Sequence, residues 1–157
     1  MTQNRKIFMF VVNVEGAVFK DDSWLIIKRS MTEEHAAGQL SLAGGKVEQE
    51  GPSSNILERT LKREIEEETG IEISDDMCYV HSTSFISDDG TQVVDVVFLC
   101  EYKRGTPYAK CEEEVPSAAW MTFEEIMADE DSPPWLKNSI QLSNSLKLKK
   151  ETGQILP

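Results

Sequence analysis

Runs of apolar residues separated by short polar segments predict a chain that is rich in β-strands. Two of these runs near the N-terminus are joined by a short acidic turn, which predicts a β-hairpin. Two more flank the sequence Asp88-Asp89-Gly90, another hairpin signal. Polar loops are expected between the strands. The predicted strands cover residues 5–20, 24–28, 77–86, 91–102 and 117–121.

The clearest helix is predicted over residues 56–69, where apolar side chains recur every three or four positions. Asn55 with Glu58 three residues later resembles a capping box at its start. Gly70 is a suitable residue for ending it in the left-handed conformation. The segment should therefore form a helix with well-defined ends.

Two further helices follow the last predicted strand. Thr122 with Glu125 forms a second capping box, and Ser132 with Pro133 resembles an N-cap followed by a proline in the first turn. The final helix is expected near residues 133–148. The order of strands and helices indicates one domain over residues 1–157. Its fold class is α/β or α+β, with helices packed on a mixed sheet.

Composition and charge narrow the class of protein. The 157 residues include 16 basic and 28 acidic side chains, so the formal net charge is −12. This balance argues against a surface for nucleic acid or anionic membranes and is compatible with cation binding. Three cysteines form no CxxC pair, which favours a reducing compartment. The apolar run at residues 7–12 is too short for a signal peptide or a membrane span, so we expect a cytoplasmic protein.

The helix at 56–69 carries an unusual cluster of negative charge. Glu64, Glu67 and Glu68 lie on one side of it, next to the apolar stripe rather than opposite that stripe. The stripe consists of Leu57, Leu61 and Ile65. Like charges one turn apart, and acids near a helix C-terminus, are each unfavourable. Carboxylate oxygens with uncompensated charge suit Mg²⁺ or Mn²⁺, although a solvated acidic face is the alternative.

At these residues the sequence resembles the Nudix box of the MutT-like Nudix hydrolases. That pattern is Gly, five residues, Glu, seven residues, then Arg-Glu-apolar-any-Glu-Glu-any-Gly-apolar. Residues 63–71 match its second half at every position, and Gly44-Gly45-Lys46-Val47-Glu48 resembles its opening. The resemblance covers roughly residues 7–130, with the box at 45–71. It implies a mixed β-sheet sandwiched between α-helices.

The first half of the box departs from the family pattern. Its Gly and its Arg are 18 positions apart here rather than 14, so about four extra residues lie near 49–54. Counting back from the Arg, the first Glu of the pattern falls on Asn55. Glu48 or Glu50, on the longer loop, is a candidate replacement. A catalytically weakened domain that binds a nucleotide or a protein partner is therefore the alternative to an active enzyme.

The resemblance implies hydrolysis of the diphosphate linkage in a nucleoside diphosphate that is joined to another moiety. Candidate substrates are nucleoside triphosphates, ADP-ribose-like compounds and nucleotide sugars. Glu64, Glu67 and Glu68 match the family's metal-binding positions, and the carbonyl of Gly44 is a further candidate ligand. The implied cofactor is Mg²⁺, with Mn²⁺ as an alternative. One of the carboxylates would activate the attacking water.

Further site residues follow from the same resemblance, each with a simpler alternative. Arg63 would orient the helix carboxylates, or form an ordinary surface pair with Glu67. Lys46 and Arg29 match positions that contact substrate phosphates, or are solvated cations. Glu114 is a candidate distal metal ligand or base, or part of a solvated acidic loop. The expected partner is a small nucleotide substrate, and the oligomeric state is left open, a homodimer included.

Other residues with chemical potential are assigned structural roles. Asp95, within an apolar strand, is expected to face solvent, with substrate contact as the alternative. His35 and His81 are isolated and are expected to be surface or loop residues. The tryptophans are expected to be mainly core residues: Trp24, Trp120 and Trp135.

Overall fold

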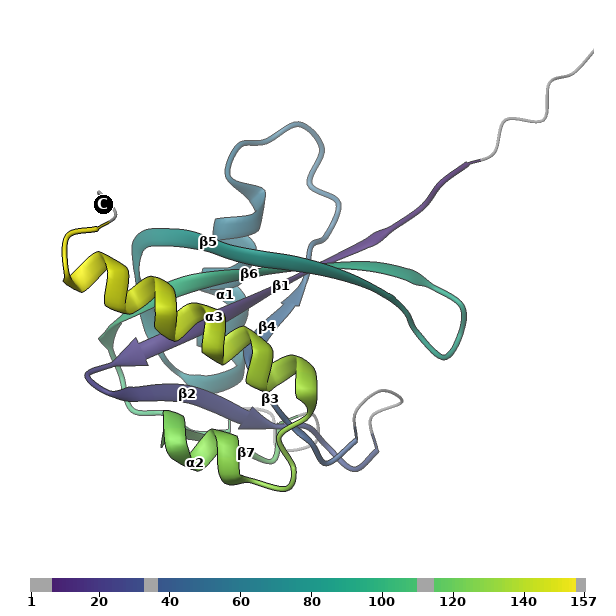
Figure 1. The fold of residues 1–157 in the computed structure, drawn as a ribbon. Coiled ribbons are helices and arrows are strands. Elements are labelled where there is room, and N and C mark those ends of the chain that lie inside the picture. Colours follow the sequence, from purple (N-terminus) through teal and green to yellow (C-terminus); the bar gives the residue numbers. More distant parts are fainter. Residues whose placement is uncertain (1–6, 33–36, 110–114, 155–157) are drawn as a thin grey trace, which may run out of the picture.

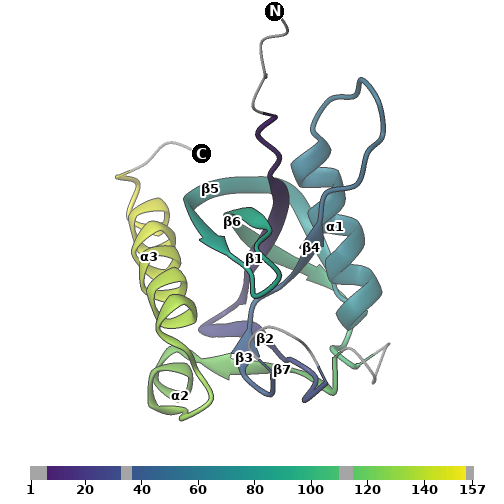
Figure 2. The same ribbon diagram turned by 90° about the vertical axis from the view of Figure 1, so that its right-hand side faces the viewer.

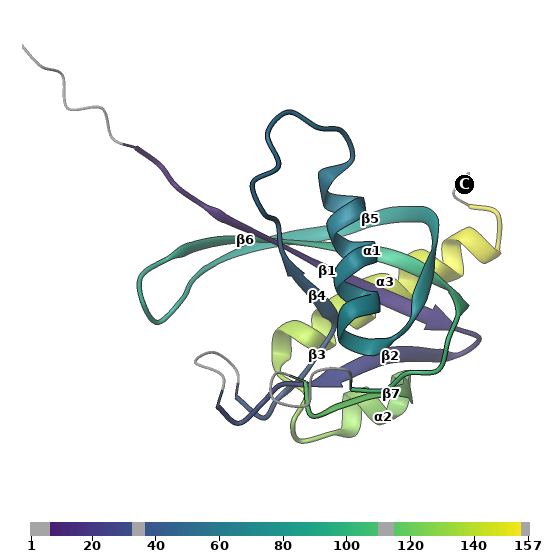
Figure 3. The same ribbon diagram turned by 180° about the vertical axis from the view of Figure 1, so that it is seen from behind.

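A mixed β-sheet with helices on both faces forms the body of the protein, as the sequence predicts (Figure 1). The computed structural model describes residues 7–32, 37–109 and 115–154. Figure 2 shows α1 on one side of the sheet and α3 on the other. In Figure 3, where the molecule is seen from behind, α1 lies in front of the sheet. The elements are β1 (Val11–Lys20), β2 (Ser23–Lys28), β3 (Leu40–Ser41), β4 (Ala43–Lys46), α1 (Ile56–Thr69), β5 (Glu72–Ile86), β6 (Gln92–Arg104), β7 (Ser117–Thr122), α2 (Phe123–Ala128) and α3 (Pro134–Glu151).

Strand β1 lies at the centre of the sheet. It pairs in parallel with β6 along almost its whole length, from Val11↔Val93 to Phe19↔Glu101. On its other side it pairs with β4 near its start and with β2 near its end, both antiparallel. The glycine-rich strand β4 is therefore held directly beside the first half of β1. This arrangement positions the loop that leads into α1.

Alternating residues of the central strands fill two separate cores. Val14 and Val18 of β1 pack with Leu61 and Ile65 of α1 on one face of the sheet. Ala17 belongs to the opposite core, which also contains side chains of α3 and β6. Because strand side chains alternate between faces, one strand can anchor both layers. Leu61 and Ile65 of the apolar stripe of α1 are buried as predicted, and Leu57 is partly buried.

Helix α1 packs very closely on β1 at Gly16. A Cβ atom at that position would lie 2.7 Å from Cδ1 of Ile65. Gly16 therefore permits this close approach. The helix ends at Gly70, whose φ of 77° is left-handed as expected. The predicted capping box is wrong, because Asn55 has a φ of 56° and its side chain makes no capping hydrogen bond.

The β-rich prediction is correct in outline but not at every boundary. Residues 7–10 lie outside β1, with side chains 52–82 % exposed, because β1 and β6 begin to pair only at Val11. The two predicted hairpins are present, between β1 and β2 and between β5 and β6. Strand β5 begins at Glu72, earlier than predicted, and register shifts between Glu72 and Met77 interrupt its pairing with β6.

The C-terminal helices follow their predicted signals with one shift. Thr122 and Glu125 form the reciprocal capping box at the start of α2. Pro133, rather than Ser132, is the N-cap of α3, which continues to Glu151. Because Pro133 has an extended backbone, the helix starts one residue later than expected.

The remaining structural predictions concern cysteines, tryptophans and membrane spans. Cys78 and Cys100 are free thiols, and Cys111 lies outside the described residues. Trp24 is buried and Trp120 packs against the α1-side core, whereas Trp135 is about half exposed on α3. Among the helices of the described ranges, none has the length and apolar character needed to cross a bilayer.

Candidate active site

Strand β4 lies between α1 and the first half of β1, and its two glycines allow close contact on both sides. A Cβ atom on Gly44 would lie 1.9 Å from the carbonyl oxygen of Val14. A Cβ atom on Gly45 would lie 2.5 Å from Cδ of Glu64. Side chains at these positions would displace either the neighbouring strand or the glutamate. The glycine pair therefore has the crowded surroundings that the sequence indicates.

The three box glutamates of α1 do not have the same surroundings. Glu68 reaches β4, where its Oε2 accepts a hydrogen bond from the Gly44 amide over 3.3 Å. Glu64 lies against Gly45, whereas Glu67 lines an outer groove of α1 together with Arg63 and Glu66. Two of the three predicted metal ligands are thus near the glycine strand, and the third lies beside them on the outer side.

Electrostatic contacts connect these residues. Partial burial raises the pKa of Glu64, and the nearby negative charges of Glu67 and Glu48 add to this effect, while Arg63 opposes it. Nη2 of Arg63 lies 3.6 Å from Oε1 of Glu64. Within the part of the chain that the structure describes, Arg63 forms its ion pair with Glu64 and not with Glu67. The α1 cluster therefore contains more negative charge than its neighbouring cation balances.

The α1 cluster, which consists of Glu64, Glu67 and Glu68, has the type of ligand atoms and the negative charge that a hard divalent cation requires. Its side-chain donors are all carboxylate oxygens, and the backbone of Gly44 is adjacent to Glu68. Among the described residues, no three His, Cys, Asp or Glu side chains converge where they could hold one ion. Glu64 and Glu68 lie one helical turn apart, so rotation of flexible side chains is sufficient to bring their oxygens together.

Glu48 and Glu50, the two candidate replacements for the missing first Glu of the box, have different surroundings. Glu50 pairs with Nη2 of Arg59 over 2.7 Å and accepts a hydrogen bond from Ser53, so it serves the inserted loop. Glu48 is exposed and close enough to Glu64 to raise its pKa. Of the two residues, Glu48 is the one whose charge acts on the carboxyl group of Glu64.

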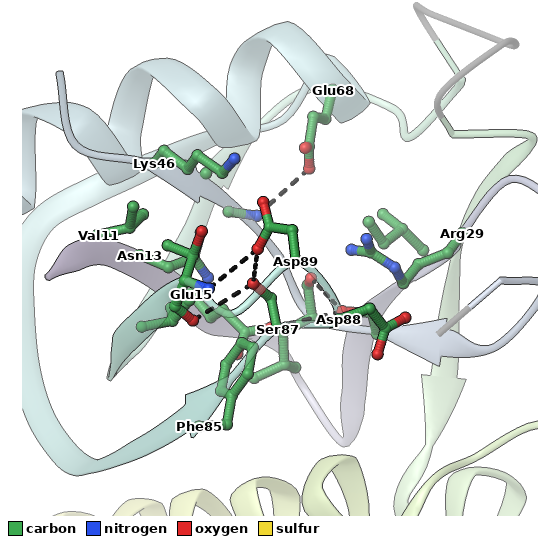
Figure 4. Close-up of a pocket in the computed structure, with 17 residues that line it drawn as sticks. Val11, Asn13, Glu15, Arg29, Lys46, Glu68, Phe85, Ser87, Asp88 and Asp89 are labelled. Carbon is green, nitrogen blue, oxygen red and sulfur yellow. Dashed lines mark hydrogen bonds between the residues drawn. The ribbon is translucent and has the colours of Figure 1, made fainter. Parts of the chain in front are cut away.

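A cavity of about 410 Å³ opens beside β4 and contains several of the predicted residues (Figure 4). Arg29, Lys46 and Glu68 all line it, although they come from three different parts of the chain. The tip of the β5–β6 hairpin forms another wall. Its remaining lining includes Val11, Asn13, Glu15, Ser41, Phe85, Ser87, Asp88, Asp89 and Val93.

A polar cluster at the cavity floor was missed at the sequence level. Asp95 is only 6 % exposed, and its Oδ1 accepts a 2.6 Å hydrogen bond from Nδ2 of Asn13. The prediction that Asp95 faces solvent is therefore wrong, because the pairing of β1 with β6 at this position brings the side chain of Asn13 against it. The signal in the sequence was the alternation of Asn13 and Glu15 within an apolar run, which places both side chains on one face.

Glu15 has the most perturbed carboxyl group of this cluster. Burial raises the pKa of Glu15 well above its usual value, and contact with the Asp95 carboxyl raises it further. A hydrogen bond from Ser41 Oγ, 3.4 Å from Oε2, and the positive charge of Arg29 act in the opposite direction. Two carboxyl groups in contact cannot both remain charged without a large cost, so Glu15 favours its protonated form.

Other predicted residues lie elsewhere or outside the described ranges. Glu114 and His35 are outside them, so the structure says nothing about their roles. His81 lies within strand β5 and is partly buried, with Nε2 2.9 Å from Oγ of Ser139 on α3, so it is neither isolated nor a loop residue as expected. Trp135, which was expected in the core, is 48 % exposed on α3 and does not line the cavity, so that prediction is wrong.

Comparison with known proteins gives consistent matches. The family model described as "NUDIX domain" matches residues 9–142. A MutT NUDIX hydrolase from Burkholderia pseudomallei superimposes with a TM-score of 0.72 and 24 % identity, covering 86 % of this chain and 98 % of the other. A NUDIX hydrolase from Nitrosomonas europaea has the same TM-score and 22 % identity, with 88 % and 91 % covered.

A third similar structure is the MutT protein from Methanosarcina mazei Go1, with a TM-score of 0.70 and 20 % identity. The alignment covers 88 % of this chain and 95 % of that protein. No curated protein sequence matches the chain significantly. The structural matches therefore establish the fold, and the family model establishes the family.

Proposed function

Because the chain belongs to the NUDIX domain family, we propose that it is a pyrophosphohydrolase that acts on a nucleoside diphosphate joined to another moiety. Hydrolases of this family in general use divalent metal ions, and we propose Mg²⁺ here, with Mn²⁺ as a substitute. Residues 1–157 would act as one domain. The leaving and attacked groups of such a substrate are phosphates, so the site must bind concentrated negative charge.

The proposed metal ligands are the carboxylates of Glu64, Glu67 and Glu68 and the carbonyl oxygen of Gly44. A bound divalent ion would neutralise charge on the diphosphate and favour attack by water. Arg63 would keep Glu64 oriented through their ion pair. One of the box carboxylates, or Glu114, would accept the proton of the attacking water.

Substrate phosphates would be held from the cavity side. Arg29 and Lys46 both line the cavity, and each can donate charge-assisted hydrogen bonds to phosphate oxygens. Glu68 lines the same cavity from α1. A diphosphate between these groups would therefore contact cationic side chains while remaining next to the proposed metal ligands.

The main observation in support of the proposal is that two features, the box glutamates and a cavity, lie next to the same strand, β4. The box glutamates Glu64 and Glu68 approach the glycine pair from α1, and a cavity of a size suitable for a small molecule opens beside the same strand. A solvated acidic helix would not require a glycine such as Gly45 to make room for one of its carboxylates, that of Glu64.

The test is a metal-dependent substrate panel. The purified protein is incubated with Mg²⁺ or Mn²⁺ and with nucleoside triphosphates, ADP-ribose, dinucleoside polyphosphates and nucleotide sugars, and products are separated by chromatography. At least one compound should be cleaved at its diphosphate linkage. Glu67→Gln should reduce kcat by about 100-fold or more, because it removes a proposed metal ligand.

Glu66→Gln is the matched control, because Glu66 is exposed on the same helical turn and is not a proposed ligand. Full activity of Glu67→Gln would contradict the assignment. The alternative, a domain that binds nucleotides without cleaving them, is favoured by Asn55 in place of the first box Glu. It predicts calorimetric binding without turnover, and recovery of turnover in Asn55→Glu would identify a weakened catalytic site.

A further inference from the structure

Residues 7–10 form an exposed apolar segment in front of β1. The exposed fractions of its side chains are 82 % for Ile7, 79 % for Phe8, 78 % for Met9 and 52 % for Phe10. The pairing of β1 with β6 begins only at Val11 and its pairing with β4 only at Asn13, so the segment extends beyond both neighbouring strands (Figure 1). Four consecutive large apolar side chains in contact with water are unfavourable, and a surface of this kind marks an interaction site.

A second exposed element is the outer strand of the β5–β6 hairpin. In the part of the chain that the structure describes, β5 is the last strand of the sheet and pairs with β6 alone. The side chains over 82–86 are all exposed, Phe85 by 37 % and Ile86 by 64 %. The backbone N–H and C=O groups of an edge strand can pair with an added strand. Figures 1 and 3 show that the hairpin and the N-terminal segment project from the same side of the molecule.

The segment and the outer edge of β5 in one chain are not placed to pair with each other. Strand β6 lies between β1 and β5, so residues 7–10 are separated from that edge by two strand spacings, about 10 Å. The hairpin also reverses direction at residues 87–91, next to the start of pairing between Val11 and Val93, so it provides no strand beside residues 7–10. The corresponding edge of a second copy is not restricted in this way.

Charge complementarity favours a second copy as the partner of the segment. The net charge of −12 makes two copies repel each other unless opposite charges meet at their contact. Arg5 and Lys6 come shortly before the apolar segment in the sequence, whereas Asp88 and Asp89 follow the end of β5 at the tip of the hairpin. Antiparallel pairing of residues 7–10 with β5 brings the basic pair to the acidic pair, and parallel pairing separates them.

One antiparallel register also matches the apolar side chains. It places Ile7 opposite Ile86 and Phe8 opposite Phe85, and residues opposite each other on antiparallel strands share a face of the sheet. Because Phe85 lines the cavity, Phe8 of the partner subunit would extend the wall of that cavity. Two reciprocal contacts of this kind remove on the order of 1,000 Å² of surface from water, which is the size that a specific interface requires.

We propose that the protein forms a symmetric dimer in which residues 7–10 of each copy add as an antiparallel strand to the outer edge of β5 in the other copy. The main-chain hydrogen bonds of the added strand provide affinity, and its apolar side chains and the charges at the hairpin tip fix its register. The dimer is independent of the proposed hydrolase, because none of its contacts uses a proposed metal ligand or phosphate-binding residue.

The experiment is sedimentation-velocity ultracentrifugation of the full chain over a range of concentrations, which gives the dissociation constant of the dimer. The wild-type protein should dimerise with a Kd of about 10 μM or lower. Phe8→Ser should raise this Kd by about tenfold or more, because it removes an apolar anchor of the contact. Leu142→Ser is the matched control, because Leu142 is 42 % exposed on α3, outside the proposed contact, and its Kd should be unchanged.

An exchange of charges tests the direction of the added strand. Arg5→Glu and Asp88→Arg should each raise the Kd of the dimer about 3- to 10-fold, and their combination should restore it, because opposite charges then face each other again. Thermal melting identifies any variant that is unfolded.

Two results would overturn the dimer: a monomer at all concentrations, or a dimer whose Kd does not respond to Phe8→Ser. Failure of the combined charge variants to restore the Kd would overturn the antiparallel pairing. Cleavage of a substrate by a monomeric protein would contradict the dimer and leave the proposed hydrolase intact, whereas a dimer that cleaves nothing in the panel would do the reverse.

Discussion

Two acidic clusters lie near β4, one on α1 and one on the cavity floor, and their carboxyl groups differ in exposure and in hydrogen bonding. On α1, Glu64 and Glu68 are partly exposed and Glu67 is exposed, and Arg63 forms an ion pair with Glu64. On the cavity floor, Glu15 and Asp95 contact each other and are hydrogen-bonded to Asn13 and Ser41. We propose that the first cluster binds an external cation, whereas the carboxyl groups of the second are hydrogen-bonded within the protein.

The physical cause of this difference is the secondary structure that carries each cluster. Helix residues three and four positions apart lie on one surface, so their carboxylates remain near solvent and repel one another. Side chains of adjacent strands at the same register are pressed together and covered by neighbouring elements. The same residue types therefore produce a metal-binding candidate in one place and a hydrogen-bonding floor in the other.

The largest expected effect is the difference in stability between alanine substitutions at the two neighbouring glycines of β4, Gly44 and Gly45. Gly44→Ala would place a Cβ atom against the backbone of Val14, so we expect a loss of about 3 kcal/mol or more in the free energy of unfolding. Gly45→Ala would meet only the flexible end of Glu64, so the fold should persist while activity falls about 10- to 100-fold. Urea denaturation and kcat measurements on both variants test this. Equal stability of the two variants would show that β4 is not constrained by β1.

An effect of intermediate size is expected on the stabilisation by metal ions, which should depend on the α1 glutamates and not on Asp95. Mn²⁺ or Mg²⁺ at about 100 times its dissociation constant should stabilise the fold by about 2.7 kcal/mol and raise Tm by about 5–10 °C. Glu64→Gln should remove most of this increase, whereas Asp95→Asn should retain it. Differential scanning fluorimetry with and without EDTA makes the comparison. Loss of the increase only in Asp95→Asn would mean that the cation binds at the floor.

The smallest expected effect is the pH dependence that Glu15 contributes. Its pKa is raised in the folded protein, so the folded state binds more protons than the unfolded state between the unfolded and folded pKa values. Its contribution to stability is therefore complete at pH values below the unfolded pKa and is lost as pH rises through the folded pKa. Glu15→Gln should flatten this decline in metal-free urea denaturation measured at a series of pH values. An unchanged slope would contradict the burial of this carboxyl group.

Local sequence signals predicted most of the elements correctly. The stop of α1 at Gly70 and the capping box of Thr122 with Glu125 depend on residues only a few positions apart. Asn55 was an exception, because the inserted loop before α1 holds its backbone in a left-handed conformation that a capping pattern does not indicate. Asp95 was another, since its burial depends on a strand 82 positions away.

The amino-acid sequence by itself determined the acidic helix, its apolar stripe and the glycine pair, because helical periodicity and turn chemistry act within a few residues of each other. Only the tertiary structure decided which side of β4 each carboxylate occupies, and that Asn13, Glu15 and Phe85 line one cavity. These relations depend on the register of β1, β5 and β6. Strand register is selected by packing between segments that are distant in the chain, so no local pattern specifies it.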